Sequence, residues 1–93
     1  MENINKIIQR ATKLETITNA PILKYLTIYQ DNEGRTQSAF TFSKEQALFK
    51  SLGIKDNESI NYFLQRKYGE TAMILYCALA GIDNKKRLSS CIK

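Results

Sequence analysis

Side chains that commonly carry out chemistry are few and scattered in this sequence of 93 residues. Histidine, the usual general base near neutral pH and the commonest metal ligand, does not occur. Two cysteines, Cys77 and Cys91, do not make a structural zinc site without histidine partners. The glycines stand singly and form no phosphate-binding loop, and the acidic residues are dispersed along the chain. We therefore expect a non-enzymatic protein with no catalytic residue, metal or cofactor.

The basic residues are the clearest functional feature. The net charge is +5, and the last eleven residues carry four basic side chains against one acidic one. Short basic runs bind nucleic acid, acidic protein surfaces or anionic membranes, and they also occur as plain solvated ends. If the first and fourth elements lie on the same side, basic residues there would extend the patch. The candidate partner-binding residues are Lys85, Lys86, Arg87 and Lys93 in the tail, Lys6, Arg10 and Lys13 near the start, and Arg66 and Lys67.

Five tyrosines raise a second possibility, because aromatic side chains on a sheet can stack on nucleic-acid bases. Three of them belong with apolar helical residues, which leaves Tyr25 and Tyr29 as secondary candidates. Lys24 and Arg35 could supply phosphate contacts beside them. The alternative is that these tyrosines only cover the hydrophobic core.

Residues 46–63 resemble a helix-turn-helix, with a short helix, the sequence Leu-Gly-Ile and a second helix with a polar start. Phe49 and Ser59 stand where that motif has a small and an apolar residue, so the turn would be longer than usual. The resemblance implies contact with DNA by the second helix. Two ordinary packed helices joined by a glycine stop account for the same residues.

Of the elements that must position these residues, the most apolar is the run from Ala72 to Ile82, which has no charged side chain. A helix that is apolar all round is either buried or membrane-spanning. A span needs about 20 apolar residues, and Glu70 and Asp83 bracket this run too closely. We expect a central buried helix in which Leu75 and Leu79 are both deeply buried.

The first half of the chain predicts a helix and a hairpin. Apolar residues recur at helical spacing from residue 4 to 17, so a helix should run from about Asn3 to Thr18 and end before Pro21. Side chains in residues 22–29 and 37–42 alternate between two faces, as they do in β-strands. Tyr25 and Tyr29 would lie on one face of the first strand, and Phe40 and Phe42 would share a face of the second. Residues 31–34 have turn chemistry, which joins the strands into a β-hairpin.

Capping signals divide the second half into short helices. Ser43 and Gln46 have the spacing of a capping box, and Gly53 should end the helix that they begin. Asp56 or Asn57 is the expected cap of the next helix, which Gly69 ends. For the tail, residues 84–93, the pattern leaves two alternatives, a last short turn or a frayed end.

Together these features predict a single α+β domain over residues 1–93. It has an N-terminal helix, a two-stranded antiparallel β-hairpin and three C-terminal helices with the last one buried. The first residues lack the basic-then-apolar layout of a secretion signal, so we expect a cytoplasmic protein that does not enter a membrane.

The function predicted from the sequence is non-enzymatic binding. Lysine, isoleucine and asparagine supply 28 of the 93 residues (10, 11 and 7), a bias typical of AT-rich genomes such as those of many phages and bacteria. A phage- or plasmid-encoded modulator that covers a host protein or a nucleic-acid-handling complex would have this appearance. Direct DNA or RNA binding and a structural homo-oligomer, such as a homodimer formed by hairpin pairing, are the alternatives.

Overall fold

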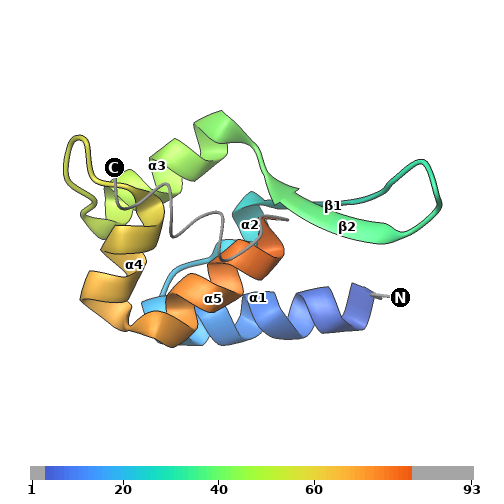
Figure 1. Cartoon of the computed structure of the whole chain (residues 1–93), viewed down its shortest axis with the longest axis horizontal. Coiled ribbons are helices and arrows are strands. Elements are labelled where there is room, and N and C mark those ends of the chain that lie inside the picture. Colours follow the sequence, from blue (N-terminus) through green and yellow to red (C-terminus); the bar gives the residue numbers. More distant parts are fainter. Residues whose placement is uncertain (1–3, 81–93) are drawn as a thin grey trace.

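A computed structural model describes residues 4–80 of the chain. In Figure 1 the hairpin projects from one end of a group of helices, which is the mixed α+β arrangement that the sequence predicts. The tail, with Lys85, Lys86, Arg87, Lys93 and Cys91, lies outside the described residues. Along the described part the elements are α1 (Ile4–Thr18), α2 (Ile22–Tyr25), β1 (Leu26–Gln30), β2 (Thr36–Phe40), α3 (Phe42–Leu52), α4 (Ile60–Tyr68) and α5 (Glu70–Leu79).

Helix α1 follows the predicted bounds closely. Its buried side chains, Ile7, Ala11, Leu14 and Thr18, recur every three or four residues and form one stripe. At its end the Thr18 hydroxyl donates to the Leu14 carbonyl at 2.7 Å, and Asn19 takes a φ of 55°. The predicted helix is therefore confirmed.

The prediction of a strand over residues 22–29 is wrong in its first half, because residues 22–25 form the helical turn α2. Its first turn is stabilised from outside, since the Leu23 N–H donates to the Glu15 carboxylate of α1 at 2.9 Å. Pro21 precedes the turn with a φ of −80°, close to the value that its ring imposes. A contact from another helix thus overrides the β-branched composition of this segment.

Strands β1 and β2 pair antiparallel, with Ile28 opposite Ser38 and Tyr29 opposite Gln37. Asp31 organises the turn, because its Oδ1 accepts from the backbone N–H groups of Glu33 and Arg35, both at 2.9 Å. The predicted hairpin is confirmed with shorter strands. The Ser38 hydroxyl donates to the Leu79 carbonyl at 2.7 Å, which anchors the inner face of the hairpin on α5.

The start of α3 differs from the prediction. Thr41, not Ser43, occupies the N-cap position and makes no side-chain capping bond, so the predicted capping box does not form. Phe42 is the first residue of α3 and is 71% exposed, whereas Phe40 is half-buried on β2. The two phenylalanines therefore do not share a strand face, because the chain leaves the sheet at Thr41.

The end of α3 is as predicted. Gly53 has a φ of 101°, a left-handed conformation that glycine adopts without steric cost. The Ile54 N–H donates to the Phe49 carbonyl at 3.1 Å, and Ile54 packs against the core. This is the glycine stop followed by an apolar residue.

Helix α4 begins later than predicted. Its N-cap is Ser59, whose hydroxyl accepts from the Tyr62 N–H at 3.2 Å, and not Asp56 or Asn57. Asn57 instead takes a φ of 67° within the α3–α4 connection. Residues 53–59 separate α3 from α4, a longer connection than the three or four residues of a helix-turn-helix. Gly69 ends α4 as predicted.

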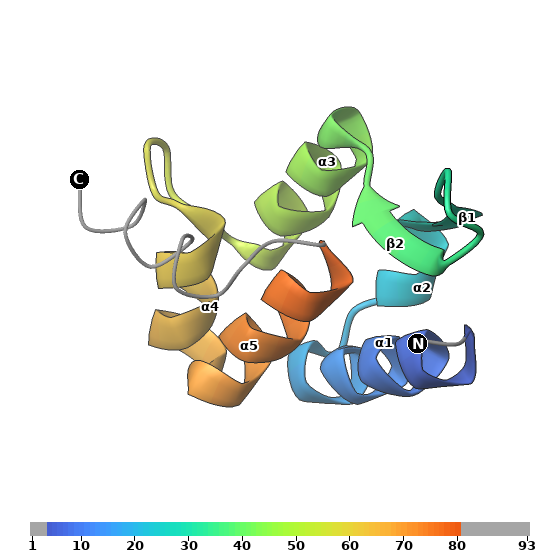
Figure 2. The same ribbon diagram turned by 45° about the vertical axis from the view of Figure 1, so that its right-hand side comes forward.

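Helix α5 lies between α1 and α4 and forms the centre of the core (Figure 2). Tyr76 is fully buried, with its ring 5.5 Å from those of both Phe40 and Phe49. The prediction of full burial is correct for Leu79 but wrong for Leu75, which is only half-buried. Ile74 is 45% exposed, so α5 does have a solvent side, because neighbouring elements cover only part of its circumference.

Within residues 4–80, none of the helices has both the length and the apolar composition needed to cross a membrane.

Candidate binding cleft

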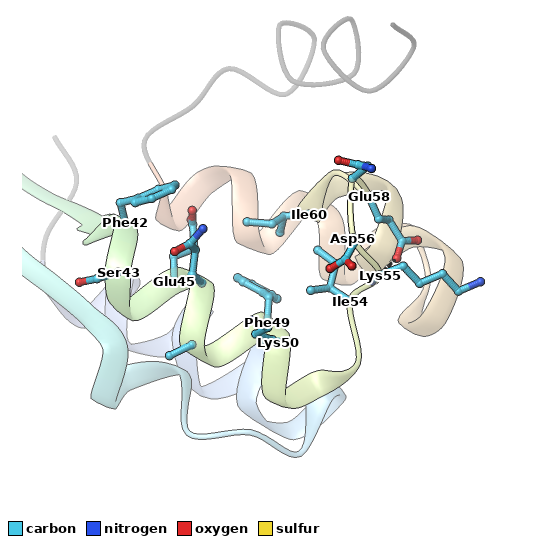
Figure 3. A pocket seen from close by; sticks show the side chains of 13 residues that line it. Phe42, Ser43, Glu45, Phe49, Lys50, Ile54, Lys55, Asp56, Glu58 and Ile60 are labelled. Carbon is cyan, nitrogen blue, oxygen red and sulfur yellow. Dashed lines mark hydrogen bonds between the residues drawn. The ribbon is translucent and has the colours of Figure 1, made fainter.

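A cleft of about 570 Å³ lies between α3, the α3–α4 connection and the start of α4 (Figure 3). Its volume lies within the range of about 300–1,000 Å³ that is usual for ligand sites. Apolar side chains of the cleft come from α3, the connection and the start of α4: Phe42, Ala47, Phe49, Ile54 and Ile60.

The apolar side chains differ in exposure along the cleft. Phe49 is 1% exposed and belongs to the core, while Ile54 and Ile60 are half-buried against it. Phe42 stands at the opposite end and exposes most of its ring to solvent. Phe42 has that position because α3 begins there. Strand β2 ends at Phe40, which packs against the core, and a single residue separates the two elements.

Two carboxylates of the cleft are held by the fold. Glu45 accepts a hydrogen bond from the buried Tyr76 hydroxyl. Glu58 accepts from Arg66 at 2.8 and 3.1 Å and from the Lys55 N–H at 3.0 Å. The hydrogen bond from Arg66 lowers the pKa of the Glu58 carboxyl below its usual 4.5. Both groups are therefore fixed in place.

The remaining charged lining residues are Lys50, Lys55 and Asp56, all exposed. A cleft with an apolar floor and a charged rim has the composition of a protein-binding site. Within residues 4–80, the structure contains no cluster of three or more His, Cys, Asp or Glu side chains that could hold a metal ion.

The three basic residues of α1 differ in exposure. Lys6 and Lys13 are exposed, whereas Arg10 is half-buried beside the buried stripe of the helix. Lys6 and Lys13 therefore face solvent.

Arg66 and Lys67 face a different part of the molecule. Arg66 is paired with Glu58 of the connection, and the Lys67 ammonium donates to the Leu52 carbonyl at the end of α3, at 2.6 Å. Arg66 and Lys67 are thus held by the α3–α4 connection and the end of α3, whereas Lys6 and Lys13 are exposed on α1.

The secondary candidates on the hairpin are not arranged as predicted. Tyr25 belongs to α2 and is half-buried, whereas Tyr29 on β1 is 47% exposed. They do not share a strand face, because the helical turn ends the alternation at residue 25. Lys24 is exposed, and Arg35 pairs with Asp31 at 3.1 Å and with Glu33 at 3.1 Å within the turn.

Phe42 is the principal residue that the sequence reasoning missed. Its place in an alternating segment suggested a strand, and strand alternation predicts burial beside Phe40. One available signal was Thr41, a residue type that favours helix N-caps and would have started α3 before Ser43.

Comparisons with protein-family models, with curated proteins and with solved structures find no match to this chain.

Proposed function

We propose that this chain is a non-enzymatic binding protein that covers part of a partner protein, with the α3 cleft as its contact surface and Phe42 as its anchor. The observation that carries the proposal is the 71% exposure of a phenylalanine at the edge of an apolar cleft. Aromatic anchors in desolvated pockets dominate the energetics of many interfaces.

The expected contribution of Phe42 follows from its exposed area. An aromatic side chain buries about 150–250 Å², and covering apolar surface contributes about 25 cal/mol per Å². Burying the 71% of Phe42 that is exposed would thus contribute about 3–4 kcal/mol. Removing the side chain should weaken binding by about 100- to 700-fold, since each 1.4 kcal/mol is tenfold.

The partner class follows from the charge. A net charge of +5 favours association with acidic surfaces through the basic residues outside the cleft, because the cleft itself is lined by three acidic and two basic side chains. The composition suits a phage- or plasmid-encoded modulator of a nucleic-acid-handling complex. The basic residues of α1 and of the tail would then guide the approach, because charges at the rim mainly change the association rate.

The test is affinity capture from host lysate, with and without nuclease, followed by measurement of affinity with the purified partner. Phe42→Ala is compared with Tyr62→Ala, because Tyr62 is 55% exposed and is not among the residues that line the cleft. We expect nuclease-resistant capture that is lost for Phe42→Ala and kept for Tyr62→Ala. Equal capture by the parent and both variants would refute the cleft as the contact surface.

Direct nucleic-acid binding is the second candidate, and the exposure of Lys6 and Lys13 on α1 favours it. Replacing both with alanine should then weaken binding, as should replacing Lys85, Lys86 and Arg87. Affinity should also fall steeply with salt, with a log–log slope of about −0.9 per phosphate contacted on duplex DNA or about −0.7 on single strands. A shallow slope with unchanged affinity in these variants would refute direct binding.

A further inference from the structure

The outer edge of strand β1 has no strand partner within the described residues. Among residues 4–80, the sheet contains only β1 and β2. Strand β2 packs on α1 and α5, whereas the main neighbours of β1 are β2 and the adjoining turn α2. In Figure 1 the hairpin extends away from the helices. The edge of β1 is therefore open to a further strand.

The turn shows which backbone groups of β1 point outward. The Asp31 N–H donates to the Arg35 carbonyl at 2.9 Å, so this pair is hydrogen-bonded across the hairpin. Hydrogen-bonded and non-bonded pairs alternate along an antiparallel ladder. With the observed register, Thr27 and Tyr29 bond to β2, whereas the N–H groups of Ile28 and Gln30 point to the open edge.

Strand β1 lacks three of the features that usually protect an exposed strand, namely a lysine, a proline and a bulge. Its sequence is Leu-Thr-Ile-Tyr-Gln, and its register to β2 is uninterrupted. Tyr29 is 47% exposed on the outer face of this strand. An uncharged, β-branched and aromatic edge is suited to pairing with an identical strand.

We propose that two copies of this chain form a homodimer by antiparallel pairing of their β1 strands, with the two-fold axis between the Tyr29 residues. In this register the Ile28 N–H of one copy donates to the Gln30 carbonyl of the other, and the Gln30 N–H donates to the Ile28 carbonyl. The axis repeats both bonds, which satisfies every outward N–H identified above. The Tyr29 rings become a non-bonded cross-strand pair, in which Cβ atoms lie about 4.5–5.5 Å apart.

The charges at the two ends of the edge complement each other. Exposed Lys24 precedes β1, and the turn after it carries Asp31, Glu33 and Arg35, two acidic residues and one basic residue. Antiparallel pairing about Tyr29 brings the Lys24 end of each copy next to the acidic turn of the other. In this register only residues 28–30 of each five-residue strand lie opposite the strand of the other copy, which covers much less than the roughly 1,600 Å² of a stable complex. The dimer is therefore weak and depends on concentration.

The main test is analytical ultracentrifugation of the full chain from about 1 μM to about 1 mM, the range in which weak complexes form. We expect the mass of the parent to rise from 10.7 kDa toward twice that value with concentration. Gln30→Pro removes an outward N–H while leaving the bonds between β1 and β2, since proline is tolerated on such edges. Gln30→Pro should stay monomeric, and Gln30→Ala should dimerise like the parent.

A cross-linking test checks the register independently of the proline variant. In a Cys91→Ser background, Tyr29→Cys should form an intermolecular disulfide under mild oxidation. Thr27→Cys on the same strand face should not, because the two copies of residue 27 would be separated by about four residues, or about 13 Å. A parent that stays monomeric throughout the range, a Gln30→Pro variant that dimerises like it, or linking at residue 27 but not at residue 29 would each overturn the proposal.

Discussion

Replacing Leu79 with alanine should lower the free energy of unfolding much more than the same change at Leu75. The two leucines lie one helical turn apart on α5 and lose the same atoms, so differences in helix propensity cancel. Leu79 is 0% exposed, whereas Leu75 is half-buried at the edge of the core. The comparison therefore isolates burial.

The expected magnitudes follow from that difference. Truncating a fully buried leucine costs about 2–5 kcal/mol, because the transfer free energy is lost and a cavity remains. Leu75→Ala should cost roughly half as much, since less apolar surface leaves water at that position and the site stays open to solvent. For a small domain with a stability of about 5–15 kcal/mol, the larger loss is a substantial fraction.

Urea unfolding followed by circular dichroism measures both values. With an m value of about 1.5 kcal/mol per M, a loss of about 3 kcal/mol moves the midpoint by about 2 M. The m values of the variants should match that of the parent, which confirms that only stability has changed. Equal midpoints for the two variants, or a larger shift for Leu75→Ala, would refute the assignment of the buried side of α5.

Three further predictions concern single side chains. Cys77, at 1% exposure, should resist brief iodoacetamide treatment in the native protein and react after unfolding, which mass spectrometry of the labelled peptide measures; rapid native labelling would contradict its burial. Ser59→Ala should lower the free energy of unfolding by about 1 kcal/mol, because the α4 cap is lost. Asp56→Ala should change the urea midpoint little, and a larger shift for Asp56→Ala than for Ser59→Ala would support Asp56 as the cap instead. Because the pKa of Glu58 is lowered in the folded state, its contribution to stability is present above pH 4.5 and is lost as the pH falls through the folded value. The stability difference between the parent and Glu58→Gln should therefore shrink on acidification, and a constant difference in urea midpoint from pH 7 to pH 3 would argue against this linkage.

Local patterns in the sequence were sufficient for the long helix, the turn and the glycine stops. Helical periodicity identified the buried stripe of α1, because that helix covers the core with a single face. Gly53 and Gly69 have positive φ values that other residues rarely adopt, so their positions marked helix ends directly. The order of elements in the α+β fold followed from these signals and from the apolar run of α5.

Tertiary structure decided the features that depend on contacts between distant residues. The Glu15 carboxylate of α1 supports a helical turn at residues 22–25, where composition favoured a strand, and this separates Tyr25 from Tyr29. Neighbouring elements cover only part of the circumference of α5. Ile74 is therefore exposed and Leu75 half-buried, although both are as apolar as the buried Leu79. Phe42 lies at the edge of a cleft because β2 ends at Phe40 and α3 then leaves the sheet. In each case the physical reason is the same: propensity and periodicity describe one segment, whereas burial depends on which other segments pack against it.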